Sequence, residues 1–265
     1  MGNGVHAPSG DHVAGDAPAR VAGLLLAAGS GRRYGQPKAL VDTGSGPWVL
    51  SSLDALSGCD VRYVVVGASA GDVAALLPPG VHALHNQEHS SGMGSSLRLG
   101  LRTLSAAAGD SVHAQDHAED ADELRVRGDV PPCDAVVVHL VDLPGVGPDV
   151  VRRLVCAAGS ASASRGVLLR AGYFGVPGHP VMLGRDHWAG VIEGATGDTG
   201  GLGYFRRHPP ALVECGDIGS GEDVDVPPTP GRPVRQQART VDSDKPDGEA
   251  PSNTLPHRAS AGPAG

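Results

Sequence analysis

The sequence predicts a three-layer α/β fold, in which helices cover both faces of a mostly parallel β-sheet. Apolar runs of strand length alternate along the chain with stretches of helical spacing, and this alternation is typical of parallel strands joined by helices. Several of the runs are apolar at consecutive positions, as expected for strands that are covered on both faces. Hydrophobic residues make up 40% of the 265 residues, which is enough to bury a sizeable core.

The expected elements follow one another in a regular order. The first apolar run, residues 21–27, predicts a strand, and residues 49–56 predict the helix after it. Further strands are expected at residues 61–67, 135–141 and 166–169, and further helices at residues 71–77, 94–104 and 148–157. In sheets of this kind ligands bind at the carboxyl ends of the strands, so we expect the functional residues in the loops that follow these runs.

A single folded domain is expected at residues 20–230. Residues 1–19 and 231–265 are polar, small and turn-forming, which predicts a disordered leader and a disordered tail. Within the domain, residues 105–132 contain seven acidic residues and two arginines, which predicts a solvated acidic insertion.

The composition excludes several classes of protein. A net charge of −8 argues against a general binder of nucleic acid or of anionic membranes, because both need a basic surface. No apolar run approaches the roughly 20 residues of a membrane span, and the first residues lack the charged and apolar regions of a secretory signal. No two of the four cysteines form a C-x-x-C pair. This spacing favours cysteines that are small buried side chains over a zinc site or a disulfide framework. We therefore expect a cytoplasmic protein without nucleic-acid or membrane partners.

A glycine-rich loop follows the first predicted strand. Gly29, Gly31 and Gly35 allow tight turns and a close approach of backbone N–H groups to a ligand, while Arg33 and Lys38 add positive charge. This combination favours a polyphosphate cradle, although a simple strand-to-helix turn with surface arginines would have the same composition. The loop matches neither the Walker A motif nor the dinucleotide-binding motif.

Lysine usage points to the same loop. The chain has 21 basic residues, but only two of them, Lys38 and Lys245, are lysines. Lys245 falls in the predicted tail, so the domain keeps one lysine, and that lysine lies in the glycine-rich loop. A compact ammonium group can bridge phosphate oxygens in a space that is too tight for a guanidinium group.

The loop sequence L-A-A-G-S-G-R-R-Y-G-Q-P-K-A-L resembles the pattern L-A-A-G-x-G-x-R-x-G-x-P-K-x-L of the MobA-like nucleotidyltransferases. Within that superfamily it is most similar to the molybdenum cofactor cytidylyltransferase branch. The resemblance implies a three-layer Rossmann-like nucleotidyltransferase fold. It also implies that the nucleotide is bound by Leu26, Ala27, Ala28, Gly29, Gly31, Arg33 and Lys38, and that Arg33 and Lys38 are catalytic.

Two further segments carry the resemblance on the nucleotide side. Residues 86–101 are similar to the second motif of the family, which implies that Gly92 and Ser95 lie near the nucleotide; a plain helix start would have the same composition. The apolar run of V-V-H-L-V-D-L-P leads into Asp142, whose carboxylate is costly to bury unless it is paired or metal-bound. In the family this aspartate is catalytic and binds magnesium, whereas an aspartate that caps a turn is the alternative.

The last three segments lie on the acceptor side and at the end of the domain. G-V-P-G-H-P and G-D-T-G resemble family segments that contact the acceptor, which implies that His179 and Asp198 bind it. D-V-D-V-P resembles the family's closing D-[I/V]-D-T-P-E-D and implies that Asp225 is the second magnesium ligand. The sequence departs from the family here, because Val226, Pro228 and Thr229 replace the usual Thr, Glu and Asp.

The resemblance implies Mg²⁺-dependent transfer of CMP from CTP to a molybdopterin-type acceptor, with release of pyrophosphate. Ala28 favours CTP over GTP in this comparison, and a molybdenum hydroxylase apoenzyme is an expected partner. Three alternatives remain open: transfer of GMP or another nucleotide to a different acceptor, an oxidoreductase that binds a nicotinamide cofactor, and a non-catalytic cofactor-binding protein on the same scaffold.

Overall fold

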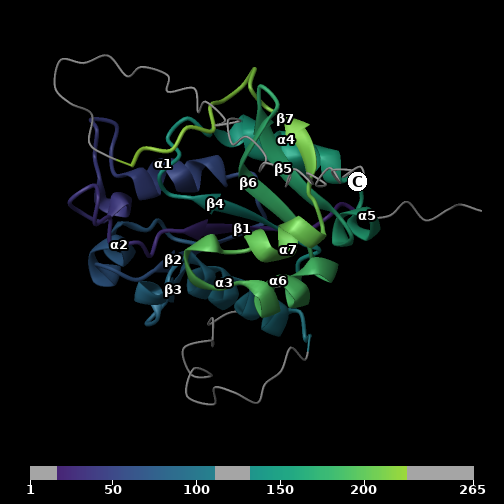
Figure 1. Ribbon diagram of the computed structural model, residues 1–265, viewed down its shortest axis with the longest axis horizontal. Helices are drawn as coiled ribbons and strands as arrows, with labels where there is room; N and C mark the ends of the chain where they lie inside the picture. The colour runs from purple at the N-terminus through teal and green to yellow at the C-terminus, as the bar shows by residue number, and fades with distance from the viewer. Residues whose placement is uncertain (1–16, 111–131, 226–265) are drawn as a thin grey trace, which may run out of the picture. The chain divides into compact units, whose positions relative to one another are not determined.

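A seven-stranded mixed β-sheet forms the centre of the protein (Figure 1). The computed structural model describes residues 17–110 and 132–225. The order of the strands across the sheet is β3-β2-β1-β4-β6-β5-β7. In chain order the strands are β1 (Val21–Leu26), β2 (Val61–Val66), β3 (Val81–His85), β4 (Ala135–Leu140), β5 (Leu168–Tyr173), β6 (Val176–Gly184) and β7 (Ala211–Glu214).

Most strand pairs are parallel, as predicted. β1 pairs in parallel with β2 and β4, β2 with β3, and β5 with β7, whereas β6 is antiparallel to both β4 and β5. In the β1–β4 pair, Leu26 lies opposite Leu140. The carboxyl ends of these two strands therefore meet at one edge of the sheet, together with the loops that follow them.

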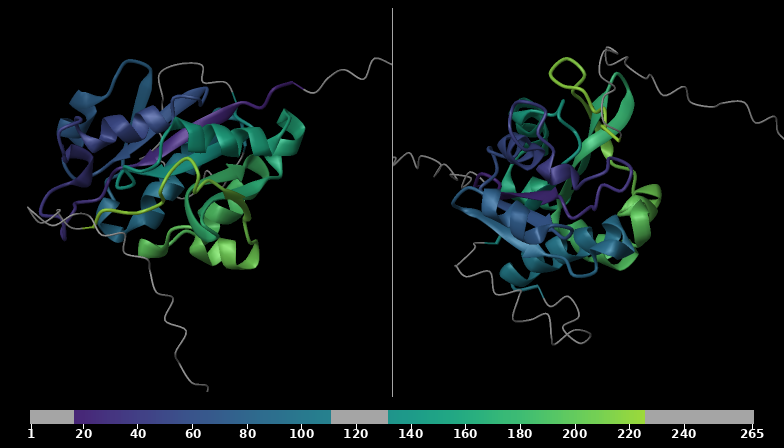
Figure 2. Two further views of the ribbon diagram at one scale, coloured as in Figure 1. Left: turned by 90° about the horizontal axis from the view of Figure 1, so that it is seen from above. Right: turned by 90° about the vertical axis from the view of Figure 1, so that its left-hand side faces the viewer.

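Helices cover both faces of the sheet (Figures 1 and 2). One face packs against α1 (Trp48–Ala55), α2 (Ala70–Leu76) and α4 (Pro148–Ala158), and the other against α3 (Met93–Ala107), α6 (Trp188–Gly194) and α7 (Leu202–Arg207). The predicted three-layer α/β architecture is thus confirmed. The remaining helical segments are α5 (Ala161–Arg165) and the 3-10 helices η1 (Lys38–Leu40), η2 (His89–Ser91), η3 (Arg185–His187) and η4 (Gly197–Thr199).

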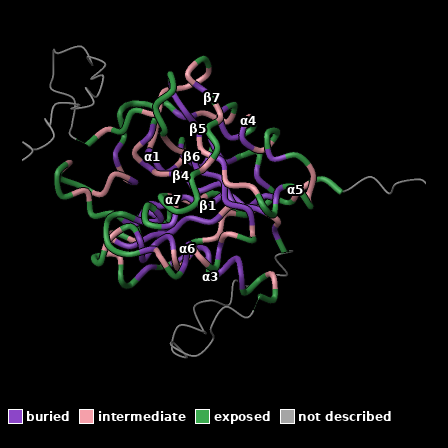
Figure 3. Tube along the Cα trace, turned by 45° about the vertical axis from the view of Figure 1, so that its right-hand side comes forward, coloured by how far each residue is buried: buried purple, intermediate pink, exposed green. Residues whose placement is uncertain are grey.

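The central strands are buried along their length (Figure 3). All six residues of β1 and five of the six in β4 are buried. Two clusters of mainly Val, Leu and Ala side chains, one on each face of the sheet, make up the core. This arrangement explains why the strands are apolar at consecutive positions rather than at alternate ones.

The predicted elements are found, but several strands were not predicted. The strands expected at 21–27, 61–67 and 135–141 match β1, β2 and β4 within one residue, and the four expected helices match α1 to α4. The strand expected at 166–169 begins later and extends to Tyr173. In β3, histidines interrupt the apolar residues, and β7 is only four residues long; most residues of both strands are not buried. The first half of β6 contains two prolines and a glycine.

Two predicted boundaries and the expectation for one cysteine need correction. Residues 105–107 of the predicted insertion belong to α3, and Ser105 is buried, whereas residues 111–131 lie outside the described part of the chain. At the end of the predicted leader, Pro18 forms a β-bridge with Ser160; residues 1–16 and the predicted tail lie outside the described residues. Cys156 is exposed on α4, unlike the other three cysteines, which are buried as expected.

Within the described ranges, no helix is long and apolar enough to cross a bilayer.

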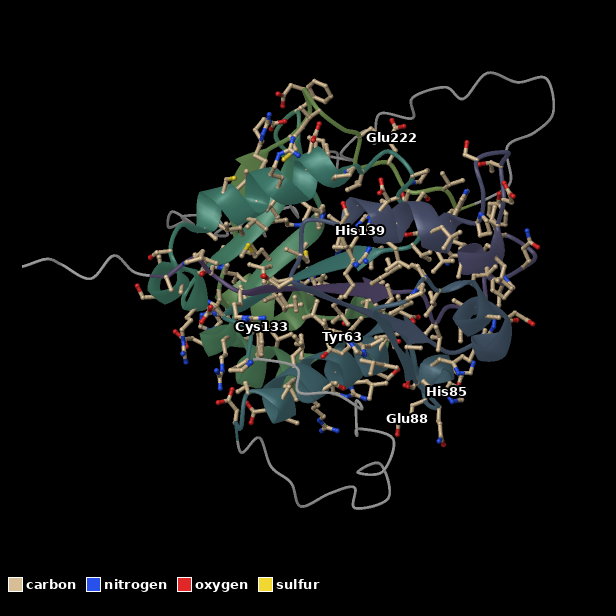
Figure 4. The ribbon with its side chains drawn as sticks, turned by 180° about the vertical axis from the view of Figure 1, so that it is seen from behind. Tyr63, His85, Glu88, Cys133, His139 and Glu222 are labelled. Carbon is tan, nitrogen blue, oxygen red and sulfur yellow. The ribbon has the colours of Figure 1, made fainter. Side chains whose placement is uncertain are left out.

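His139 of β4 is a polar residue in the middle of the core (Figure 4). Its side chain is fully buried, and among the described residues neither ring nitrogen has a hydrogen-bond partner. Burial, with a smaller contribution from the charge of His179, lowers the pKa of the His139 imidazole from 6.5 to about 3. The ring is therefore neutral in the folded protein at neutral pH.

This shift predicts a pH-dependent stability. Between pH 6.5 and 3 the unfolded chain protonates His139 while the folded protein does not, so stability is complete above pH 6.5 and falls as the pH is lowered. We expect His139→Leu to reduce the dependence of the unfolding free energy on pH below 6.5 by up to about 1.4 kcal/mol per pH unit. Because the change removes two unpartnered polar atoms, stability at pH 7.5 should be kept or raised.

Urea denaturation of both proteins at pH 5 and pH 7.5 measures the effect. His85→Leu, at an exposed position at the end of β3, is the matched control. An identical loss of stability between the two pH values in wild type and His139→Leu would show that His139 does not contribute.

Candidate functional site

Gly31 shapes the loop after β1. Its φ is +61°, and the N–H groups of Tyr34 and Gly35 donate to its carbonyl oxygen at 2.9 and 2.8 Å. A Cβ atom at position 31 would lie 1.8 Å from the carbonyl oxygen of Gln36, whereas a Cβ at Gly29 would meet no atom within 4 Å. The loop therefore requires glycine at position 31 for its own geometry, and Gly29 leaves open space around its backbone.

Lys38 lies between two aspartates at the carboxyl edge of the sheet. Its Nζ donates to Asp142 Oδ2 at 2.9 Å and to Asp225 Oδ1 at 2.8 Å. Lys38 begins η1 after the glycine-rich loop, and Asp142 lies two residues beyond the end of β4. The structure thus brings together three predicted site residues that are up to 187 positions apart in the chain. We call these three residues the carboxylate cluster.

The carboxylate cluster is partly shielded from water. The side chains of Lys38 and Asp142 are 15% and 21% exposed, and that of Asp225 is 51% exposed. Burial lowers the pKa of the Lys38 ammonium, but the hydrogen bonds and charges of Asp225 and Asp142 outweigh it, so the net effect raises this pKa. Lys38 therefore stays charged and neutralises one of the two carboxylates, which leaves the cluster with a net negative charge.

Arg33 lies at the outer side of the carboxylate cluster. Its side chain is 84% exposed, and Nη1 lies 3.9 Å from Asp225 Oδ2. An exposed ion pair at this distance adds little to stability. The guanidinium group is therefore available to an anionic ligand that approaches the glycine-rich loop.

The three predicted residues before Gly29 hold the start of the loop in place. Ala27 N donates to Val65 O at 2.9 Å, and Ala68 N donates to Ala28 O at 3.1 Å, so both residues continue the pairing of β1 with β2. Leu26, Ala27 and Ala28 are all buried. Their backbone thus fixes where the glycine-rich loop leaves the sheet.

The second predicted nucleotide segment is organised by Asn86, a residue that we did not select from the sequence. Its buried amide Nδ2 donates to Ser95 Oγ at 2.8 Å and to Ser96 Oγ at 2.9 Å, and its Oδ1 accepts from Glu88 N at 2.9 Å. Ser95 is itself buried, and its hydroxyl also lies 2.8 Å from the carbonyl oxygen of Gly92. The hydroxyl of Ser95 is thus engaged within the segment that leads into α3.

Gly92 joins this segment to the predicted acceptor side. Its φ is +109°, and a Cβ there would lie 2.4 Å from the carbonyl carbon of Gly197 and 2.7 Å from Asp198 Oδ1. Only glycine allows this close approach of the start of α3 to η4. The two predicted substrate sides therefore contact each other directly.

A cavity of about 380 Å³ lies beside this contact. Leu26, His179 and Asp198, three of the predicted site residues, line it. Most of the other lining side chains are apolar, and they come from β4, β6, α3 and α7. Arg170 of β5, which the sequence analysis did not select, adds a cation to this lining.

His179 is a neutral group in this cavity. Burial, together with the positive charge of Arg170, lowers the pKa of its imidazole from 6.5 to about 4. Its backbone is held from the neighbouring strand, because Tyr173 Oη donates to His179 O at 2.7 Å. At neutral pH the ring can donate or accept a hydrogen bond without adding charge.

The predicted site residues thus form two adjoining groups. The first is the carboxylate cluster with Arg33 and the glycine-rich loop, and the second is the cavity that contains His179 and Asp198. Sequence reasoning missed Asn86 and Arg170. Asn86 begins a segment that was selected as a motif, whereas Arg170 has no motif around it and is recognisable only from its place in the cavity.

Comparison of the sequence with known proteins identifies its family. Residues 23–212 match the family model of the MobA-like NTP transferase domain. The nicotine blue oxidoreductase of Paenarthrobacter nicotinovorans is 33% identical over 222 residues, which cover 78% of this chain and 92% of that protein. The sequence relationship therefore extends over most of both chains.

Solved structures share the fold. The homologue of Mycobacterium tuberculosis Rv0371c from Mycobacterium sp. strain JC1 superposes with a TM-score of 0.58 at 24% identity, over 78% of this chain and 91% of that one. Rv0371c from M. tuberculosis H37Rv gives a TM-score of 0.57 at 24% identity, over 79% and 94% of the two chains.

The different environments of two glycines predict different effects of substitution. Gly31→Ala should lower the thermal denaturation midpoint, because the new Cβ would clash with the backbone of Gln36 and the left-handed φ disfavours alanine. Gly29→Ala, the matched control in the same loop, should change the midpoint little because its Cβ has open space. Equal midpoints for the two variants, measured by circular dichroism, would contradict the geometry of the loop.

Proposed function

The chain belongs to the MobA-like NTP transferase family of nucleotidyltransferases, and from this premise we propose that it transfers CMP from CTP to a phosphorylated, molybdopterin-type acceptor and releases pyrophosphate. The observation that carries the proposal is the carboxylate cluster beside the glycine-rich loop. A lysine that is hydrogen-bonded to two carboxylates at a sheet edge, next to a loop with open backbone, provides the charges that a bound triphosphate and its counter-ion require.

The donor set of the cluster fits a small, hard divalent cation. Oxygens of Asp142 and Asp225 both lie within 2.9 Å of Lys38 Nζ, so the protein already holds one cation between them. Mg²⁺ is commonly bound through one or two carboxylates, with substrate phosphates and water as its other ligands. Among residues 17–110 and 132–225 there is no group of three or more metal-ligating side chains. In the proposed site Asp142 and Asp225 would be the protein ligands.

A structure of M. tuberculosis Rv0371c in complex with manganese shares the fold, with a TM-score of 0.50 at 22% identity. In the proposed site, a bound Mg²⁺ would neutralise phosphate charge at the reacting group. Lys38, whose ammonium lies between the two carboxylates, would be the cation that contacts the phosphates. Arg33 is exposed next to the same loop and adds a second cation.

The proposed reaction needs no general base. An oxygen of the acceptor phosphate, which is already an anion, forms a bond to the α-phosphorus, and the bond from that phosphorus to the leaving pyrophosphate breaks. The residues of this chain act by positioning and by neutralising charge. Backbone N–H groups of the loop, Lys38 and Arg33 stabilise the pyrophosphate, while His179 and Asp198 orient the acceptor. A molybdenum hydroxylase apoenzyme would receive the product.

The choice of CTP rests on Ala28. Its methyl group is buried and lies against Gly67, where an added Cβ would be 2.9 Å from it. Ala28 therefore acts through the shape of the loop start rather than by direct contact with a base.

A second candidate function is favoured by the relative from P. nicotinovorans, whose name describes an oxidoreductase. On this alternative the chain would reduce or oxidise an aromatic compound with a nicotinamide cofactor and would not depend on Mg²⁺. The cavity would then hold the aromatic compound, and the carboxylate cluster would have no part in the chemistry.

Pyrophosphate release separates these functions. With Mg²⁺ and each of CTP, GTP, ATP and UTP, we expect release from CTP alone, and only when molybdopterin-type acceptor is present. Lys38→Ala should lower the rate at least about a hundredfold, since an electrostatic group at the reacting phosphates is removed. Lys245→Ala, which changes the other lysine of the chain, is the control.

Release from GTP instead would keep the transferase and overturn the choice of CTP. Equal rates in the two lysine variants would remove Lys38 from the mechanism. No release from any nucleotide, together with Mg²⁺-independent oxidation of a nicotinamide cofactor by an aromatic substrate, would establish the oxidoreductase.

The position of Lys38 also predicts how the cation binds. Without nucleotide, the ammonium occupies the space between Asp142 and Asp225, so we expect wild type to bind Mn²⁺ weakly. Lys38→Met removes this competing charge and should raise the affinity for Mn²⁺ measured by electron paramagnetic resonance. Asp142→Asn in the same background should remove the gain. An affinity that is unchanged in Lys38→Met would show that the cluster is not the cation site.

A further inference from the structure

The cavity crosses four adjacent strands of the sheet. It is lined by Leu26 of β1, Leu140 of β4, His179 of β6 and Arg170 of β5, and these strands follow one another in the order β1-β4-β6-β5. Neighbouring strands lie about 4.8 Å apart, so the cavity extends roughly 14 Å from β1 to β5. One end adjoins the strands that lead to the carboxylate cluster, and Arg170 lies at the other end.

Arg170 has no carboxylate partner among the residues that the structure describes. It is half-buried, and its Nε donates to the backbone carbonyl of Gly178 at 2.6 Å. In the part of the chain that the structure describes, no carboxylate pairs with its guanidinium group, and burial is the one influence on its pKa, which it lowers. A partly desolvated cation without an anionic partner is costly, and it would be stabilised by an anion brought by a ligand.

The rest of the cavity selects an apolar ligand. Leu97, Leu140, Val181, Leu183 and Phe205 contribute most of its wall between the two ends. Phe205 in this wall offers a ring against which an aromatic ligand can pack, and pockets of this kind use a few polar groups to fix the orientation of the ligand. His179 is neutral at physiological pH, so Arg170 is the cation that this wall presents to a ligand.

We propose that the cavity binds an elongated, aromatic acceptor with an anionic group at the end remote from the transferred nucleotide, and that Arg170 recognises this group. The inference rests on the proposed function in one respect: the ligand is an acceptor only if the protein transfers a nucleotide. The binding of the ligand itself does not depend on nucleotide transfer. The planar guanidinium group pairs well with a carboxylate, a phosphate or another anion that offers two oxygens. Asp198, at the η4 side of the cavity, disfavours a second anionic group there.

β5, which carries Arg170, lies three strand spacings from β1, so the anion that Arg170 binds is not the reacting phosphate. Lys38 and Arg33 lie in the loop after β1, whereas Arg170 is opposite Val181 of β6 and Leu212 of β7. Its side chain is too short to span the roughly 14 Å between β5 and β1. Arg170 therefore determines which acceptor binds, and it does not take part in the chemistry at the α-phosphorus.

The experiment uses 1-naphthoate and its neutral analogue 1-naphthamide as probes of the full-length protein without nucleotide. By isothermal titration calorimetry, wild type should bind naphthoate at least about tenfold more tightly than naphthamide, the expected size of one charge-assisted contact. Arg170→Gln should reduce this preference to less than about twofold and leave the affinity for naphthamide unchanged. Arg206→Gln, an exposed arginine on α7, is the matched control and should keep the preference.

Two further variants keep the test independent of folding and of catalysis. Arg170→Lys retains the charge and should retain part of the preference, which separates loss of charge from a disturbed β5–β6 turn. Lys38→Ala should bind naphthoate as wild type does, so a failure of nucleotidyl transfer would not affect this result. Equal affinities for acid and amide in wild type, or an unchanged preference in Arg170→Gln, would overturn the proposal.

Discussion

The parallel pairing of β1 with β4 is the constraint on which the site depends. Because Leu26 lies opposite Leu140, the glycine-rich loop and the turn that carries Asp142 leave the sheet side by side. Lys38 can then reach Asp142 over 2.9 Å, although 104 positions separate them in the chain. A shift of this register by one residue would turn the apolar side chains of β4 away from their present partners, so the core that fixes the register also fixes the site.

The charge of the cluster follows from the same placement. Two carboxylates next to a buried sheet edge would repel each other, and the Lys38 ammonium offsets that repulsion in the absence of a ligand. The same ammonium is the group that a triphosphate would attract. A lysine in this position therefore stabilises the free protein and is available for the bound state, which a rigid guanidinium group would do less well.

The sequence was sufficient to predict those strands and site residues that can be recognised from their neighbours in the chain. The strands β1, β2 and β4 are mostly apolar runs, Asp142 lies two residues after β4, and Lys38 follows the glycine-rich loop that leaves β1. β6 could not be predicted because prolines and glycine interrupt its first half, and its one polar side chain, that of His179, lines a cavity. Arg170 could not be predicted because the absence of a carboxylate beside its guanidinium group, within the described residues, is a property of the surrounding strands and not of the residues next to it in sequence.

The two candidate functions make different demands on this architecture. An oxidoreductase would need the cavity, whereas a transferase needs the cavity and the carboxylate cluster together. Holding Lys38, with a side chain 15% exposed, between two carboxylates has a desolvation cost that a stable fold does not require, because apolar residues at such positions are often equally stabilising. The contact of Gly92 with η4 joins the loop segment before α3 to the wall of the cavity. On the proposed function, the carboxylate cluster would act on the triphosphate, and the adjoining cavity with Arg170 would hold the acceptor.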